Sequence, residues 1–214
     1  MKKAYASSVI KHIDPKTLEK MKISFLFSSV LIVSTLLGIF IANYASASIY
    51  PNSVFLLSNH FETAFLRCTD FLGCVKIIAL YSLSDIVLLL IIFAVSFSML
   101  NYLLTDIVLF LAGVKFGISV AFLLSFARMS NLPYSVGNIR IFLFIASELL
   151  ILALLLYYAY CAAISALSFR GTNVSGRPNI KVRDFMFFSV KTAACVGAIL
   201  ILNAIYCFLL YVLK

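Results

Sequence analysis

The stretch DIVLFLAGVKFGISVAFL, residues 106–123, contains a single charged side chain after Asp106, that of Lys115. Its length approaches the roughly 20 apolar residues that a helix needs to cross the hydrocarbon layer of a membrane. The rest of the chain has the same character, because 64% of its 214 residues are hydrophobic and 12% are charged, with a mean hydropathy of +1.11. Soluble domains carry about twice that share of charged residues. The sequence therefore predicts an integral membrane protein, an all-α polytopic helix bundle that forms a single membrane domain.

Further apolar runs on both sides of this stretch predict five membrane-spanning helices. The second and third are nearly continuous, and we place their boundary at Ser98–Asn101, where polarity rises. Four or six spans are the alternatives. The predicted spans cover residues 23–43, 77–98, 101–126, 141–168 and 186–212.

The start of the chain allows two interpretations. Asp14–Pro15 is a typical helix start, so we expect a short helix that begins there and continues into the first span. A cleaved signal peptide ending near Ala45–Ala47 is the alternative. It is disfavoured because its apolar run would have 21 residues, whereas signal peptides have about 7 to 15.

Basic residues predict the orientation of the spans, since lysine and arginine concentrate in short cytoplasmic segments. Residues 1–22 carry six lysines, and the loop 169–185 carries three arginines and one lysine. The loop 44–76 has as many acidic as basic residues, which suits the outer side. We therefore predict a multi-pass protein of the bacterial cell membrane with its N-terminus inside and its C-terminus outside. The net charge of +9 reflects this topology and attraction to anionic lipid, and no nucleic-acid partner is expected.

No residue pattern of a familiar enzyme is present in the sequence. It lacks a G-x-S-x-G elbow, an H-E-x-x-H pair and a phosphate-binding loop. His12 and His60 are distant and are predicted to lie on opposite sides of the membrane, so we expect no metal site and no cofactor. Cys68 and Cys74, in the predicted outer loop, either form a disulfide or remain thiols. We predict that the protein is not an enzyme.

Three ionisable residues on three spans are predicted to share one layer of the membrane. A helical rise of about 1.5 Å per residue places Asp85 about 14 Å, Lys115 about 17 Å and Glu148 about 12 Å below the outer surface. By the same count Asp106 lies about 30 Å down, near the inner interface, where a charge costs little. A charge at mid-depth costs at least ~2.5 kcal/mol. We therefore expect Lys115 to pair with Glu148 or Asp85, with one carboxyl protonated because the three charges sum to −1.

The faces of span three indicate that it packs inside the bundle. At about 100° per residue, Gly113 and Gly117 fall on one stripe, whereas Lys115 points to the opposite side. The Gly113-x-x-x-Gly117 spacing allows another helix to approach closely. The intramembrane charges either stabilise the bundle only or take part in function.

Residues 96–123 resemble the signature region of the stage II sporulation protein M family, a group of membrane proteins of endospore-forming bacteria. Ala112 stands where the family has a lysine, so Lys115 is either that lysine shifted or an unrelated one. The basic N-terminus, the outer loop, the span count and the chain length also agree with the family. The matching positions are Ser98, Gly113, Gly117, Phe122 and Leu123, followed by Leu132–Pro133.

The resemblance implies a non-enzymatic scaffold that holds peptidoglycan hydrolases, the stage II sporulation proteins D and P, at the septal membrane during engulfment. The outer loop 44–76, rich in phenylalanine and leucine, is then expected either to dock a partner or to pack on its own bundle. The alternative function is a membrane subunit of a transporter, either an ABC-type permease partner or an ion-coupled carrier. A bacteriocin-immunity or envelope-stress protein is a third class that the sequence does not test.

Overall fold

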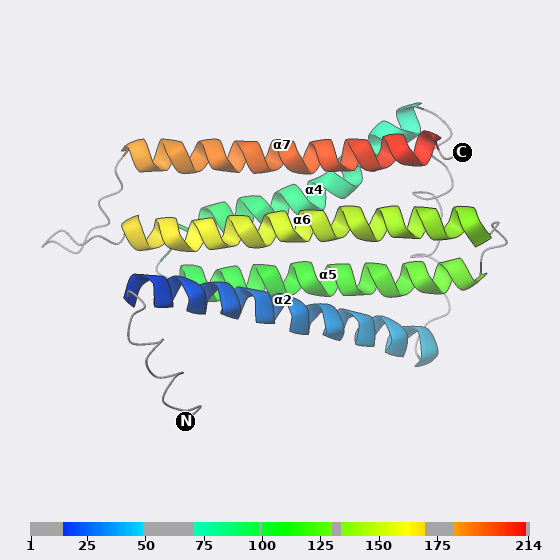
Figure 1. Cartoon of the computed structure of the whole chain (residues 1–214), viewed down its shortest axis with the longest axis horizontal. Coiled ribbons are helices and arrows are strands. Elements are labelled where there is room, and N and C mark those ends of the chain that lie inside the picture. The colour runs from blue at the N-terminus through cyan, green and yellow to red at the C-terminus, as the bar shows by residue number, and fades with distance from the viewer. Residues whose placement is uncertain (1–14, 49–70, 99, 130–133, 170–181, 213–214) are drawn as a thin grey trace, which may run out of the picture.

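The computed structural model describes residues 15–48, 71–98, 100–129, 134–169 and 182–212. This part of the chain is helical apart from one turn, and it contains no strand. An all-α membrane bundle is therefore the fold class (Figure 1). The helices are α2 (Pro15–Ser48), α4 (Phe71–Val95), α5 (Asn101–Met129), α6 (Tyr134–Phe169) and α7 (Val182–Val212).

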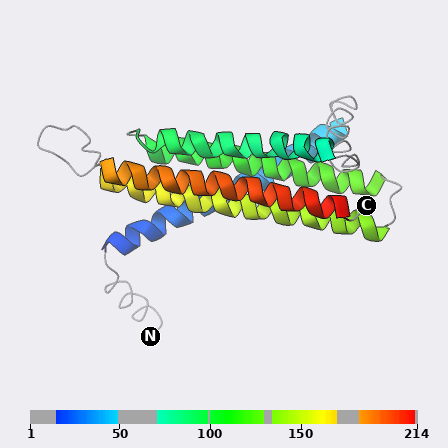
Figure 2. The ribbon, with the colours of Figure 1, turned by 90° about the horizontal axis from the view of Figure 1, so that it is seen from above.

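Four of the helices form a closed ring, and α2 lies outside it. Within the ring α4 packs on α5 and α7, and α6 packs on the same two helices. The fifth helix, α2, runs obliquely across the bundle and packs mainly on α5, with a smaller contact to α6 (Figure 2). Successive helices run in opposite directions, so α2 and α5, which α4 separates in the chain, are parallel (Figure 1).

Four of the helices are long and apolar enough to cross a membrane, namely those containing Thr17–Tyr44, Asn101–Ala121, Ile141–Ala166 and Asp184–Leu209. α4 has 25 residues and contributes the apolar stretch Ser82–Val95. Its place in the ring, beside two of the spanning helices, is that of a fifth span. Four of the five predicted spans therefore have a helix that could cross the membrane, and a crossing by α4 stays a prediction.

The helices extend beyond the predicted spans at several ends. α2 continues to Ser48 and α4 begins at Phe71, which shortens the predicted outer loop 44–76 at both ends. α6 begins at Tyr134, seven residues before its predicted span, and α7 begins at Val182. Hydropathy marks only the residues that lie in hydrocarbon, whereas backbone hydrogen bonds carry a helix on into the interface. The predicted helix start at Pro15, continuous with the first span, is confirmed.

The predicted division between spans two and three is confirmed by a turn between Val95 and Asn101. The Ser98 backbone N–H donates to the Val95 carbonyl at 2.8 Å. The Ser98 hydroxyl in turn accepts a hydrogen bond of 3.2 Å from the Leu100 N–H, just before α5 begins. Ser98 therefore satisfies a backbone donor that the start of a helix leaves without an intrahelical partner.

The orientation predicted from the charges is testable with tags at the two ends. Because α2 begins and α7 ends at opposite ends of the bundle (Figure 1), an N-terminal and a C-terminal reporter should lie on different sides of the membrane. We expect alkaline phosphatase to be active at the C-terminus and green fluorescent protein to fluoresce at the N-terminus. The reverse pattern would contradict the orientation, and two tags on one side would contradict the five-span count.

Candidate functional site: a charge cluster between three helices

The three ionisable residues predicted to share a layer come from three adjacent helices of the ring. Lys115 lies midway along α5 and faces α4, where its ammonium donates to Asp85 Oδ1 at 2.5 Å. The same ammonium donates to the hydroxyl of Ser84 at 2.7 Å. Of the two partners considered for Lys115, the structure places Asp85 in contact. Ser84, the second acceptor for the Lys115 ammonium, was not identified from the sequence.

The two side chains of this ion pair differ in how deeply they are buried. The Asp85 side chain is 3% exposed, whereas that of Lys115 is 32% exposed. Asp85 Oδ2 is buried, and it has no hydrogen-bond partner among the described residues. One oxygen of this carboxylate therefore accepts a hydrogen bond from the lysine, and the other lacks a partner in the described residues. A buried polar atom without a partner is costly in an apolar medium.

Glu148 approaches the pair from α6. It is only 5% exposed, and it lies within electrostatic range of both Lys115 and Asp85. Within the described residues, the one ion pair of the cluster joins Lys115 to Asp85. Two carboxyl groups and one ammonium, on α4, α5 and α6, therefore lie within electrostatic range of one another. We call Asp85, Lys115, Glu148 and Ser84 the charge cluster.

Asp106 lies outside this cluster, in the second turn of α5, and its predicted place near the inner interface stays a prediction. Its Oδ1 is buried without a partner in the described part of the chain. Lys191, near the start of α7, lies over the ring of Phe187 at 4.8 Å from its centroid.

The face of α5 opposite Lys115 packs against α2 through small residues. A methyl group added at Gly117 would meet the carbonyl oxygen of Thr35, and it would lie 3.1 Å from the Cα of Gly38. One added at Gly113 would meet the hydroxyl of Ser34. The two backbones are therefore in contact, as the Gly113-x-x-x-Gly117 spacing predicted for this face.

The partner stripe on α2 was not identified from the sequence. Ser34, Gly38 and Ala42 are buried against α5, and they follow one another at intervals of four residues. Gly113, Gly117 and Ala121 repeat that spacing on α5. Two matching small-x-x-x-small stripes were thus visible in the sequence. The sequence did not indicate that these two helices would pair.

Two further polar contacts connect α7 to its neighbours α4 and α6, and both were absent from the sequence-based predictions. The Asn203 amide nitrogen donates to the Ser82 hydroxyl of α4 at 3.0 Å, with both residues buried. The hydroxyls of Tyr158 and Thr192 join α6 to α7 at 2.6 Å. Buried polar side chains in a membrane bundle contribute about 0.6 kcal/mol each through such bonds.

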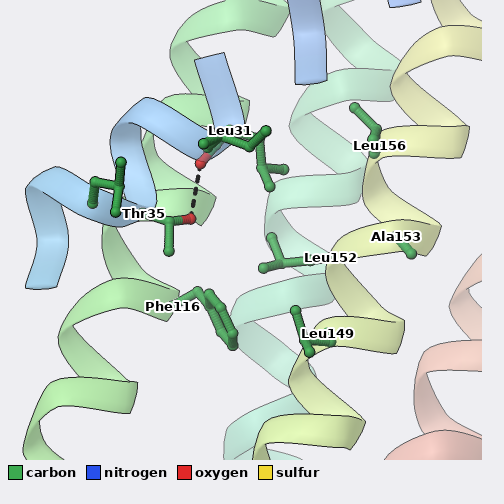
Figure 3. Close-up of a pocket in the computed structure, with 9 residues that line it drawn as sticks. Leu31, Thr35, Phe116, Leu149, Leu152, Ala153 and Leu156 are labelled. Carbon is green, nitrogen blue, oxygen red and sulfur yellow. Dashed lines mark hydrogen bonds between the residues drawn. The ribbon is translucent and has the colours of Figure 1, made fainter. Parts of the chain in front are cut away.

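An open apolar groove of about 350 Å³ runs between α2, α5 and α6. Figure 3 shows Phe116 and Leu152 on its floor, with Leu149, Ala153 and Leu156 along α6. The hydroxyl of Thr35 donates to the Leu31 carbonyl at 2.8 Å, so its hydrogen is not available to a ligand in the groove (Figure 3). The groove therefore offers shape and apolar surface, with no charged group.

The remaining predicted residues are placed as follows. Leu123 is buried in a second core cluster with Ala42, Ala121 and Phe144. Phe122 lies in α5 and Cys74 in α4, but their side chains fall outside the description. Pro133 and Cys68 lie outside the described residues, so the disulfide stays a prediction. Within the described ranges, no group of three His, Cys, Asp or Glu side chains is positioned to hold a metal ion.

Comparison with known proteins returned no match to a family model, to a curated protein or to a solved structure.

Proposed function

We propose that this protein is a non-enzymatic membrane scaffold that holds other envelope proteins at the bacterial cell membrane. One observation carries the proposal. The buried polar side chains described above bind one another between helices: Lys115 binds Asp85, Asn203 binds Ser82, and Tyr158 contacts Thr192. These contacts hold the helices together and leave apolar outer surfaces for partners.

The resemblance of residues 96–123 to the stage II sporulation protein M family names the partners of this proposal. They are peptidoglycan hydrolases anchored in the membrane, the stage II sporulation proteins D and P, acting at the septum during engulfment. Two residues of that resemblance have a packing role consistent with a stable platform, since Gly113 and Gly117 hold α5 against α2. The segment between α2 and α4 is the proposed contact for these partners.

The test is crosslinking in native cells, followed by purification through an N-terminal tag and identification of the proteins recovered. Recovery of cell-wall hydrolases is the expected result. Deletion of residues 50–74 should then abolish their recovery. The matched control is Gly197→Ala, which should keep full recovery because an added methyl group there meets no atom within 4 Å. Recovery of hydrolases by the deletion variant would contradict the proposed contact.

A transporter subunit is the second candidate, and the charge cluster favours it. Asp85 and Glu148 are buried beside one ammonium, and intramembrane ionisable residues often mark ion or proton pathways. Recovery of a nucleotide-binding ATPase in the same purification would support this candidate over the scaffold. In that case Glu148→Gln should abolish transport, whereas a scaffold should keep its partners in this variant.

A further inference from the structure

We propose that the charge cluster is a proton-binding site, in which Glu148 holds one exchangeable proton beside the Lys115–Asp85 ion pair. The ligand is a proton taken from the aqueous phase by the Glu148 carboxylate. The proposal goes beyond the scaffold and does not depend on it.

The first argument is the balance of charge. Asp85 and Glu148 contribute two negative charges and Lys115 one positive charge, so the fully ionised cluster has a net charge of −1. Both carboxyl groups are buried, at 2% and 5% exposure of the residues. An uncompensated charge is costly in such an environment, and binding of one proton removes it.

The second argument identifies the carboxyl that holds the proton. Asp85 receives the Lys115 ammonium at 2.5 Å, which stabilises the ionised form of this carboxylate. Glu148 forms no ion pair among the described residues, although it lies within range of both other groups. The proton therefore belongs on Glu148. Asp85 Oδ2 is buried and has no hydrogen-bond partner in the described part of the chain. It is therefore a hydrogen-bond acceptor still available within the cluster.

The third argument concerns the surroundings of Glu148 on every helix that packs against α6. On α5 and α4 the facing groups are Lys115 and Asp85. On α2 no ionisable residue occurs between Lys22 and Tyr44, and on α7 none occurs between Cys195 and Tyr206. No other charge among these helices is available to compensate Glu148 at this level.

A proton fits the cluster better than a metal cation. Cations such as Ca²⁺ take about six to eight oxygen ligands. The described residues hold no group of three metal-ligating side chains. One carboxyl group is sufficient for a proton.

The test is infrared spectroscopy of the protein in phosphatidylcholine vesicles at neutral pH, recorded in H₂O and in D₂O. The wild type should show the carbonyl band of a protonated carboxylic acid, shifted in D₂O because the proton exchanges. Glu148→Gln should lose this band while the protein stays folded, since the amide is a neutral group of the same shape. An unchanged band in Glu148→Gln would overturn the proposal.

Two charge variants test the coupling within the cluster. Asp85→Asn removes one negative charge and leaves Lys115 to pair with Glu148, so the acid band should be lost. Lys115→Met removes the positive charge, and the band should increase because Asp85 also takes up a proton. The matched control is Asp106→Asn, which changes a half-buried carboxyl of α5 outside the cluster and should keep the Glu148 band. An acid band unaffected by Asp85→Asn would also overturn the proposal.

The same spectra separate this proposal from the scaffold. Partner recovery is measured with intact cells, and the acid band is measured with the purified protein alone. Loss of the band in Glu148→Gln with full partner recovery supports both proposals. Failure to recover any hydrolase would reject the scaffold and leave the proton site standing.

Discussion

Gly117→Ala is expected to lower the free energy of unfolding by at least about 2 kcal/mol, because it forces a methyl group into the backbone of α2. The nearest atoms are the Thr35 carbonyl oxygen, the Ile39 nitrogen at 2.9 Å and the Gly38 Cα at 3.1 Å. None of them belongs to a flexible side chain. The two helices must therefore move apart. Unfolding in mixed micelles, followed by circular dichroism, measures the loss.

Gly197→Ala is the control for this substitution, since it makes the same change in α7 where nothing lies within 4 Å of the added carbon. Its stability should be unchanged or raised by up to ~1 kcal/mol, the helix preference of alanine over glycine. Equal destabilisation by both variants would contradict the close α2–α5 contact.

A second-site substitution sharpens the test. The methyl group of Gly113→Ala meets the hydroxyl of Ser34, which Ser34→Gly removes, although the Leu31 carbonyl remains 2.9 Å away. Ser34→Gly should therefore restore part of the stability lost in Gly113→Ala. Thr35→Ala should restore nothing in Gly117→Ala, because that contact is with the Thr35 backbone.

Lys115→Met is expected to destabilise the bundle by about 3 kcal/mol, because the buried Asp85 carboxylate loses its counter-charge and has to take up a proton to be neutral. Lys115→Met combined with Asp85→Leu should recover most of this loss, since a buried ion pair is often replaceable by apolar residues of similar size. The measurement is a double-mutant cycle on the free energy of unfolding. Additive losses in the double variant would show that the two side chains do not stabilise each other.

The same cycle at Asp106 provides the comparison. Asp106 belongs to α5 like Lys115, but its buried oxygen has no partner among the described residues. Asp106→Asn should therefore be additive with Lys115→Met within about 0.5 kcal/mol. Coupling between these two positions would mean that the charge cluster extends further along α5 than the structure indicates.

Much of this protein follows from its sequence alone. A hydrophobic share of 64% determines a membrane bundle, since only helices and closed barrels satisfy backbone hydrogen bonds in lipid. The rise in polarity near Ser98 located the turn between α4 and α5. The spacing of Gly113 and Gly117 marked a contact face, and the positions of Asp85, Lys115 and Glu148 marked a shared layer. Each of these features can be obtained from composition or from residue spacing within one apolar segment at a time.

Only the tertiary structure decided which faces meet. It selected Asp85 and Ser84 as the contacts of Lys115, and it placed Gly38 of α2 against Gly117 of α5. It also joined Asn203 to Ser82 across 121 residues of chain. Apolar runs in lipid carry almost no information on partner choice, because every outer face is equally apolar. The choice depends on close packing and on polar contacts between distant segments, which exist only once the bundle has assembled.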